Sequence, residues 1–286
     1  MINQIISGIL HISGETSFIE DNSGVRHLEN NLIWKGYLKH WNGKNVHARL
    51  LDKHDYTTGN RIIIIWPDEP SPSPDFFELY YNERLVKYPV SLCGHNAINV
   101  SGRIFNFSHL INENEIMTPE EYFYRPALGE FAPSPFTGKT DLTDPEHPYF
   151  DKFGRSFMRT IHVLRVEGID SGRLDAILRE KLEHILHLTP DPERPGENPE
   201  FHWRRNNCTT NIADALKESG LDRVTGSFPR DLFVSAAYAC IRTYGKGRVK
   251  IYRRPQLVVD EAPLSKITPM INPLNYLKLL HLKFIC

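Results

Sequence analysis

Residues 204–216 place a cysteine where a helix is predicted to begin. Asn206 and Asn207 are good N-cap residues, and Gly220 is placed to end the helix. Counted from Cys208, apolar residues at i+4, i+7 and i+8 give this helix one apolar face: Ile212, Ala215 and Leu216. The pattern therefore puts the sulfur of Cys208 in the first turn of an amphipathic helix.

A thiol in the first turn of a helix has an unusual environment. It lies at the positive end of the helix dipole, near backbone N–H groups that have no partner within the helix. Both features favour the thiolate, which is the nucleophilic form of cysteine. Cys208 is therefore a candidate nucleophile. The alternative is a small buried apolar side chain that starts a helix by coincidence, and a partner for the sulfur is needed to choose between the two.

A predicted hairpin supplies such a partner. A cysteine hydrolase needs an imidazole that exchanges protons with the sulfur, and a polar group that fixes the imidazole tautomer. His95 begins a predicted strand directly after Gly94, which lets the backbone approach closely. A turn at residues 101–102 leads to a second strand, on which Asn106 can lie beside His95. The Asn106 carbonyl can then accept the ring N–H and turn the other ring nitrogen toward the sulfur.

Plainer interpretations of these residues stay open. The chain has 13 histidines, so His95 can be a packed or surface side chain and Asn106 an ordinary hairpin residue. Cys93 is a rival thiol, but it precedes His95 by two residues and has no helix dipole, so a structural role is favoured. Cys240 lies in an apolar helical stretch and is predicted to be core. Two arginines are either a site for a substrate carboxylate or solvated side chains: Arg204 and Arg205.

The elements upstream of the hairpin predict a small all-β domain. Five short β-rich runs are separated by turns, which is typical of a barrel or sandwich of the SH3 or oligonucleotide-binding kind. The runs are residues 5–12, 17–19, 31–38, 46–51 and 61–66. The aromatic residues Trp34, Tyr37 and Trp41 form either a binding face or, as such residues more often do, part of the core. The proline-rich residues 68–74 predict the end of this domain.

The segments that position the cysteine helix follow. Residues 76–85 read as either strand or helix, and six prolines between residues 119 and 148 forbid long regular elements there, apart from a short helix beginning at 119. Strands are predicted over 155–167 and 249–252, and helices over 171–186, 231–243 and 274–285. The last helix is apolar, and we expect it to dock on the protein rather than on a membrane.

Composition bounds the class of protein. The 286 residues suffice for one large or two modest domains, and a net charge of −1 gives no reason to expect nucleic acid as a partner. The four cysteines lack metal-site spacing and, in a chain this long, favour a reducing compartment over a disulfide framework. We find no secretory signal and no apolar run of the roughly 18 residues that span a membrane. We therefore expect a cytoplasmic protein, or one exported without a classical signal peptide, with no cofactor, no metal and no integral membrane segment.

The motifs around the candidate pair resemble the permuted papain-like, NlpC-type cysteine hydrolases. The resemblance rests on residues 94–100 with 106–108, followed far downstream by 206–212, and it covers residues 88–255. The histidine hairpin precedes the cysteine helix, as in the permuted branch that includes lecithin:retinol acyltransferase-like enzymes. Residues 154–157 and the asparagine–cysteine–threonine–threonine motif look like one bacterial family of that branch whose activity is unassigned. The resemblance implies a Cys208 nucleophile, a His95 base and an Asn106 orienter, although the family's third position is often histidine.

These inferences together predict an α+β protein. We expect a permuted papain-like antiparallel sheet with a helix carrying the cysteine, preceded by a small all-β, barrel-like domain. The predicted division is residues 1–67 for the β domain, 68–87 for a linker and lead-in, 88–255 for the hydrolase domain and 256–286 for a tail. The resemblance implies a cysteine amidase or peptidase, with bacterial cell-wall peptides as the best-known substrates and a secreted effector as one setting. The alternatives are an acyltransferase or deamidase acting on a host protein or lipid, and a non-catalytic binding protein that uses the β domain.

Overall fold

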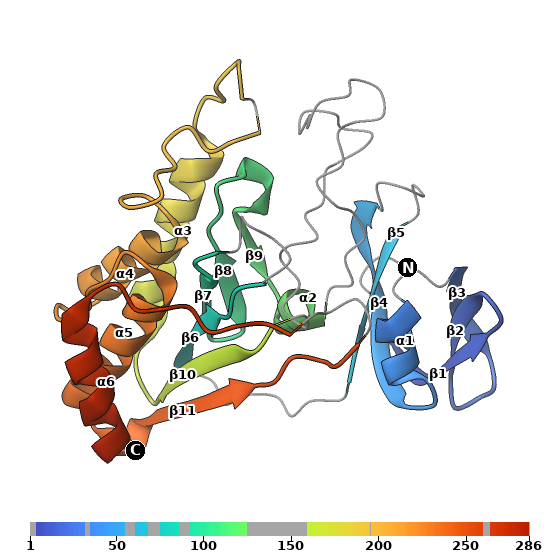
Figure 1. Ribbon diagram of the computed structural model, residues 1–286. Coiled ribbons are helices and arrows are strands. Elements are labelled where there is room, and N and C mark those ends of the chain that lie inside the picture. The colour runs from blue at the N-terminus through green and yellow to red at the C-terminus, as the bar shows by residue number, and fades with distance from the viewer. Residues whose placement is uncertain are drawn as a thin grey trace. The chain divides into compact units, whose positions relative to one another are not determined.

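A computed structural model describes residues 4–31, 35–54, 61–67, 75–85, 92–124, 159–194, 196–259 and 264–285 (Figure 1). The chain forms two compact units, each assembled from separate stretches of sequence. The first comprises residues 1–71, 120–158 and 256–263, and the second comprises 72–119, 159–255 and 264–286. The continuous division proposed from the sequence stays a prediction. Residues 154–157, which carry part of the resemblance, lie outside the described residues.

The first unit contains a five-stranded antiparallel sheet in the order β3-β2-β1-β4-β5. Its strands are β1 (Ile6–Ser13), β2 (Thr16–Glu20), β3 (Arg26–Asn31), β4 (Asn45–His54) and β5 (Arg61–Trp66), and its helices are α1 (Lys35–Trp41) and α2 (Pro119–Tyr124), whose first residue falls in the second unit. Among the described residues β3 and β5 remain the two edges, so the sheet is open. The barrel-like closure expected from the sequence is therefore wrong.

The predicted strand over residues 31–38 is a second correction. A strand does end at Asn31, but the chain then turns into α1. The buried residues Tyr37, Leu38 and Trp41 follow a helical spacing, and on a strand they would not all face one core. Tyr37 donates a hydrogen bond from its hydroxyl to the Ile65 carbonyl at 2.7 Å. Tyr37 and Trp41 are thus core residues, whereas Trp34 lies outside the described residues.

The second unit is built on a six-stranded antiparallel sheet in the order β11-β10-β6-β7-β8-β9. Its strands are β6 (Phe76–Asn82), β7 (His95–Val100), β8 (Arg103–Asn106), β9 (Glu115–Met117), β10 (Ile161–Glu167) and β11 (Val249–Arg254). Its longer helices are α3 (Gly172–Leu186), α4 (Cys208–Glu218), α5 (Pro229–Tyr244) and α6 (Pro273–Ile285), and short 3₁₀ turns lie at η2 (Ile111–Glu113) and η5 (Lys246–Arg248). The architecture of the described residues is therefore α+β with two antiparallel sheets.

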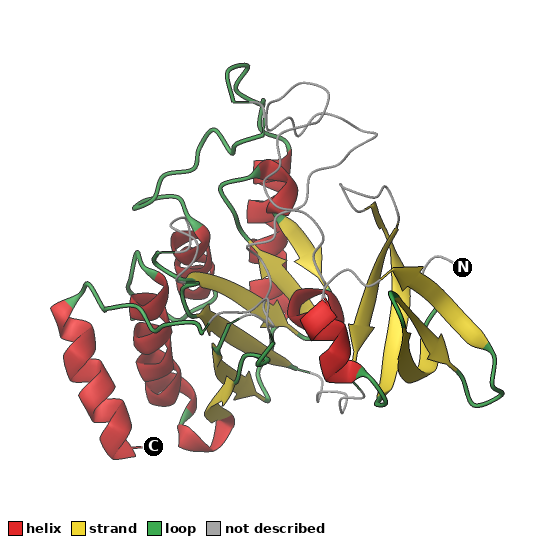
Figure 2. Ribbon diagram, turned by 45° about the vertical axis from the view of Figure 1, so that its right-hand side comes forward, coloured by secondary structure: helices red, strands yellow, loops and turns green. Residues whose placement is uncertain are grey.

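The core of the second unit lies between this sheet and its helices (Figure 2). Strand β6 is buried along its whole length, which resolves the strand-or-helix ambiguity of residues 76–85 in favour of a strand. Its alternate residues Phe77, Leu79 and Tyr81 join the core cluster with apolar residues of α3, α4 and α5. On alternate positions, the buried Glu78 accepts a hydrogen bond from Arg165 at 2.8 Å, so its charge is paired. The sheet and the helices together fix where β7 and α4 meet.

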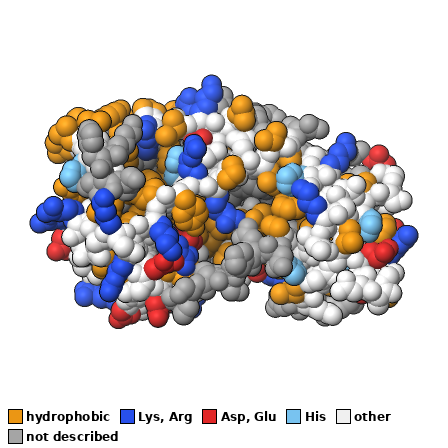
Figure 3. Space-filling view, turned by 90° about the horizontal axis from the view of Figure 1, so that it is seen from below, with side chains coloured by type: hydrophobic (Ala, Val, Ile, Leu, Met, Phe, Trp, Pro, Cys, Tyr) orange, Lys and Arg blue, Asp and Glu red, His pale blue; other side chains and the backbone are white. Residues whose placement is uncertain are grey.

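Helix α6 docks on α5 by one face. The fully buried Asn275 donates to the Asp231 carboxylate of α5 at 2.8 Å, and Leu282 is buried in the core cluster. The opposite face stays apolar and exposed along Leu274, Leu277 and Leu280. Figure 3 shows hydrophobic side chains gathered at this end of the unit. Within the described residues, we find no helix with the length and apolar character needed to cross a membrane.

Candidate active site

The hairpin predicted to carry the histidine is present as β7 and β8. The strands pair in antiparallel register, with Val100 opposite Arg103 and Ala97 opposite Asn106. The two turn residues both have positive φ, 49° at Ser101 and 91° at Gly102, which suits the twist of a tight hairpin. This register brings the first residue of β7 and the last residue of β8 to the same end of the hairpin.

Gly94 sets the path of the backbone immediately before His95. Its φ of +75° favours glycine, and a Cβ at this position would lie 2.5 Å from the backbone oxygen of Asn82 on β6. Cβ atoms do not approach backbone oxygens this closely, so only glycine fits without a shift of the strands. The close approach expected from the sequence is confirmed, and it fixes where His95 enters the sheet.

Asn207 caps the helix that carries the cysteine. Its side-chain oxygen accepts hydrogen bonds from the backbone N–H groups of Thr209 at 2.8 Å and Thr210 at 3.0 Å. Thr210 completes a capping box by accepting the Asn207 N–H at 2.9 Å. At the far end the helix closes before Gly220, whose φ is +106°. Both helix ends predicted from the sequence are confirmed.

The capping box leaves one N–H group of the first turn unused. It occupies the N–H groups of Asn207, Thr209 and Thr210, and among the described residues the N–H of Cys208 has no hydrogen-bond acceptor. A backbone N–H at the start of a helix is a suitable donor to an anion. The nucleophile candidate therefore carries, on its own backbone, a donor available to a developing negative oxygen.

His95 and Asn106 are hydrogen-bonded at the open end of the hairpin. The ring Nε2 of His95 lies 2.6 Å from Oδ1 of Asn106. The Asn106 amide cannot flip freely, because its Nδ2 donates to the backbone carbonyl of Glu113 at 2.7 Å. Since Oδ1 only accepts, Nε2 must carry the proton, and Nδ1 is left to face a proton donor or acceptor. Asn106 thus lies beside His95 across the hairpin, as the sequence predicted, and its orienting role stays a prediction.

The structure brings Cys208 together with this histidine, although the two residues are 113 positions apart. Burial raises the pKa of the Cys208 thiol, but the charge of His95, its hydrogen bond and the Asn96 backbone N–H outweigh burial and lower the pKa from its usual 9.0 to about 7. Burial lowers the pKa of His95, and the negative charge and hydrogen bond of Cys208 reverse this and raise the pKa above 6.5. Each residue therefore stabilises the charged form of the other.

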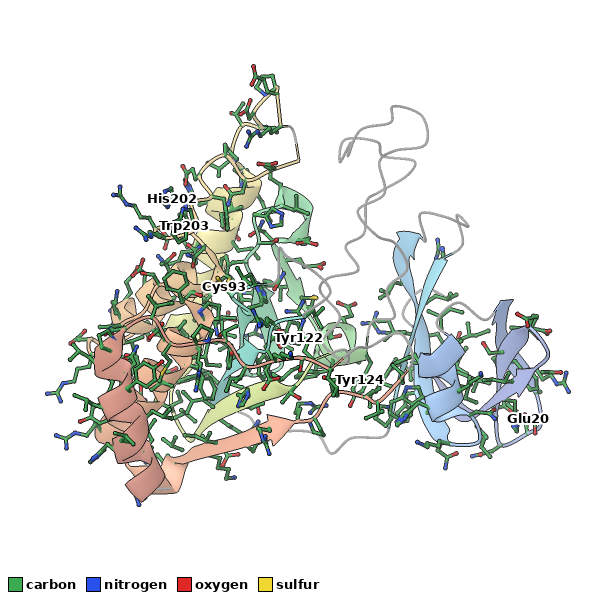
Figure 4. All side chains as sticks on the ribbon, in the orientation of Figure 1. Glu20, Cys93, Tyr122, Tyr124, His202 and Trp203 are labelled. Atoms are coloured by element: carbon green, nitrogen blue, oxygen red, sulfur yellow. The ribbon has the colours of Figure 1, made fainter. Side chains whose placement is uncertain are left out.

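Cys208 is closely surrounded by protein yet keeps part of its surface open to solvent. The other predicted thiols and the predicted cation Arg204 have surroundings that differ from those of Cys208. Burial and the charge of Cys208 raise the pKa of Cys93, which is exposed near the start of β7 (Figure 4). Cys240 is fully buried in α5, as predicted, and burial raises its pKa to about 12. Arg204 places its guanidinium 4.3 Å from the ring centre of Trp203, on the loop that leads into α4.

Three residues that act on Cys208 or His95 were not predicted from the sequence. Asn96 and Thr209 are both fully buried, and the Thr209 hydroxyl donates to the Asn96 side-chain oxygen at 3.0 Å. Arg159, buried just before β10, carries a positive charge that lowers the pKa of His95 against the effect of Cys208. The only available signal was that Asn96 and Thr209 directly follow His95 and Cys208, which does not by itself predict a contact. No group of three or more metal-binding side chains occurs in the described parts of the chain.

Comparison with known proteins adds no relative: no family model, no curated protein and no solved structure matches this chain.

Removal of the Asn106 side chain provides a test of tautomer control. In Asn106→Ala the His95 ring loses its acceptor, so Nε2 and Nδ1 compete for the proton and the ring can rotate away from the sulfur. We expect alkylation of Cys208 by iodoacetamide at pH 7 to slow about tenfold, the lower end of the loss seen when the hydrogen-bond partner that orients a metal-bound histidine is removed. Asn106→Asp keeps the acceptor and should stay much closer to the unchanged protein. Equal slowing in both variants would contradict an orienting role.

Proposed function

We propose that this protein is a cysteine hydrolase that cleaves an amide bond, with Cys208 as the nucleophile, His95 as the acid–base group and Asn106 as the orienting residue. The single observation that supports it is the convergence of these three side chains from a helix start and a distant hairpin. A sulfur with a pKa of about 7 is half ionised at neutral pH, whereas an ordinary buried thiol such as Cys240 is not.

The proposed reaction begins with attack of the Cys208 thiolate on the amide carbonyl carbon. A carbon–sulfur bond forms, and the carbonyl electrons move to the oxygen, which accepts a hydrogen bond from the backbone N–H of Cys208. Collapse of this intermediate breaks the carbon–nitrogen bond, and the His95 imidazolium gives its proton to the departing amine. A thioester on Cys208 and a free amine result.

The second half-reaction regenerates the enzyme. Neutral His95 takes a proton from water, and the hydroxide attacks the thioester carbon. The carbon–sulfur bond breaks, the acid is released, and the thiolate again faces the imidazolium. Asn106 keeps Nε2 protonated throughout, so the same ring nitrogen, Nδ1, serves both steps.

The resemblance to NlpC-type hydrolases makes a peptide amide the preferred substrate class, with bacterial cell-wall stem peptides first among the candidates. The same thioester would also serve an acyltransferase or a deamidase, because the three reactions differ only in the leaving group and in the acceptor. The acceptor and the leaving group are therefore what an experiment must determine.

The test uses the full chain and two readouts. Cys93 is exposed and would also react, so Cys93→Ser and Cys286→Ser provide a background in which alkylation reports on Cys208. We expect iodoacetamide to label Cys208 faster than a model thiol at pH 7, with half-maximal reactivity near pH 7. The protein is then incubated with cell-wall stem peptides, and mass spectrometry detects acyl-Cys208, new amines and ammonia. Cys208→Ser serves as the inactive control.

The outcomes separate the candidate reactions. New peptide amines that are absent with Cys208→Ser support hydrolysis, ammonia supports deamidation, and product formed only with an added amine or alcohol supports acyl transfer. Labelling of Cys208 no faster than a model thiol would remove the basis of all three.

A further inference from the structure

We propose that Asn96 and Thr209 are positioning residues that hold the Cys208 sulfur at His95, through a buried hydrogen bond between the residues that directly follow the two members of the catalytic pair. The inference rests on the proposed function and adds to it two residues that act through Cys208. We call the Asn96–Thr209 hydrogen bond the clamp.

The clamp joins the same two elements as the catalytic pair. Asn96 follows His95 on β7, and Thr209 follows Cys208 on α4, so both pairs are separated by 113 positions in the sequence. Consecutive Cα atoms are held about 3.8 Å apart by a planar peptide bond. Fixing Thr209 against Asn96 therefore fixes the backbone of Cys208 against that of His95, with little freedom left for the sulfur.

The Asn96 amide has only one orientation that satisfies its surroundings. Its Nδ2 donates to the backbone carbonyls of Tyr80 on β6 at 2.9 Å and Pro229 on α5 at 3.2 Å. Both acceptors are carbonyls, so the amide cannot be flipped, and Oδ1 must face the Thr209 hydroxyl and accept its proton. Asn96 is fully buried, and leaving any of these groups without a partner is costly. The clamp is therefore anchored to the sheet and to α5 as well as to α4.

The two clamp residues also act on the sulfur directly. The Asn96 backbone N–H lowers the pKa of the Cys208 thiol, and the Thr209 hydroxyl oxygen lies 3.8 Å from the sulfur. The other charged or titratable groups that act on the catalytic pair are Cys93 and Arg159. We infer that the clamp restricts the positions of the sulfur to those that face the His95 ring. Loss of the clamp should allow the sulfur more positions and weaken its interaction with His95.

The experiment removes the hydroxyl and keeps the side-chain shape. Thr209→Val is made in the Cys93→Ser and Cys286→Ser background, and alkylation of Cys208 by iodoacetamide is followed as a function of pH. We expect the midpoint of reactivity to rise by about one pH unit and the rate at pH 7 to fall about fivefold, which is the change in thiolate fraction for that shift. Thr209→Ser keeps the hydroxyl and should stay within about twofold of the unchanged protein.

The matched control is the same substitution at another buried threonine of this unit. The Thr268 hydroxyl bonds to the Tyr81 hydroxyl at 2.7 Å and not to Asn96, so Thr268→Val should lower the unfolding midpoint and leave the pH midpoint of Cys208 unchanged. Thr209→Ala also lacks the hydroxyl, and it provides a second variant should Thr209→Val fold poorly.

Two different failures remain distinguishable. If the unchanged protein shows an ordinary, slow thiol at Cys208, the proposed function fails whatever the variants do. If the unchanged protein is reactive near pH 7 and Thr209→Val lowers stability without moving the pH midpoint, only the clamp is overturned. A shift in Thr209→Val that Thr209→Ser does not reverse would also overturn it.

Discussion

Replacement of His95 by alanine is expected to slow alkylation of Cys208 at pH 7 by at least about 50-fold. Burial alone raises the pKa of the Cys208 thiol, and the charge and hydrogen bond of His95 are the main opposing influences. A thiol with a pKa near 7 is about half ionised at pH 7, whereas one with a pKa of about 9 is ionised to only about 1%. Because the thiolate reacts and the thiol does not, the rate falls in the same proportion.

The direction of the pH dependence follows from the same shift. In the unchanged protein the reactivity of Cys208 should rise as the pH increases through about 7, the pKa of the thiol beside His95. In His95→Ala the rise should move above pH 9, because burial remains and its opposing partner is gone. Loss of amide hydrolysis should exceed the loss of alkylation, since acid–base catalysis contributes a further factor of about 100 to 10,000.

The control for His95→Ala is a histidine outside the site. His184 lies on α3, is exposed, and bonds to Glu200 at 3.1 Å. His184→Ala removes an imidazole of the same kind and should leave the alkylation rate and its pH midpoint unchanged. Alkylation of His95→Ala within twofold of the unchanged protein, over pH 6 to 9, would contradict the pairing of His95 with Cys208.

Replacement of Gly94 by alanine is expected to destabilise the second unit by about 3 kcal/mol or more, and to disable the site as well. The added Cβ would meet the Asn82 carbonyl oxygen at 2.5 Å, and the φ of +75° is itself unfavourable for alanine. Backbone strain of this kind costs about 1–3 kcal/mol, and a clash with the backbone of a central strand adds to it. Since His95 is the next residue, the shift that relieves the clash also moves the imidazole away from the sulfur.

Gly102 allows the clash to be separated from the strain. It has a similar positive φ of +91°, but nothing lies within 4 Å of its added Cβ. Gly102→Ala should therefore cost only the backbone strain of about 1–2 kcal/mol and keep Cys208 reactive. Urea denaturation measures the stability of each variant, and hydrogen exchange localises any loss to the β7–β8 hairpin. Equal effects of the two substitutions would show that close packing at Gly94 has no special role.

Local sequence signals predicted the elements that carry the site. The α4 cap depends on residues within three positions of Cys208, and the hairpin depends on the Ser101–Gly102 turn and on strand alternation. Such features form from short-range hydrogen bonds and steric limits, so they are visible in a single sequence. Local composition misleads at residues 31–38, because their β-rich residues predict a strand, whereas Tyr37, Leu38 and Trp41 follow the helical spacing that the structure adopts.

The sequence alone therefore determined which residues are the candidates for this chemistry: a cysteine at a helix start, a histidine directly after a glycine, and an asparagine across the hairpin. The tertiary structure alone decided that α4 packs with its first turn at the open end of β7 and β8, which brings Cys208, His95 and Asn106 together. It also decided that Asn96 and Thr209 would meet in the core. The reason is that such contacts depend on how the sheet and helices bury their apolar faces against one another, a property of the whole unit that spacing along the chain does not encode.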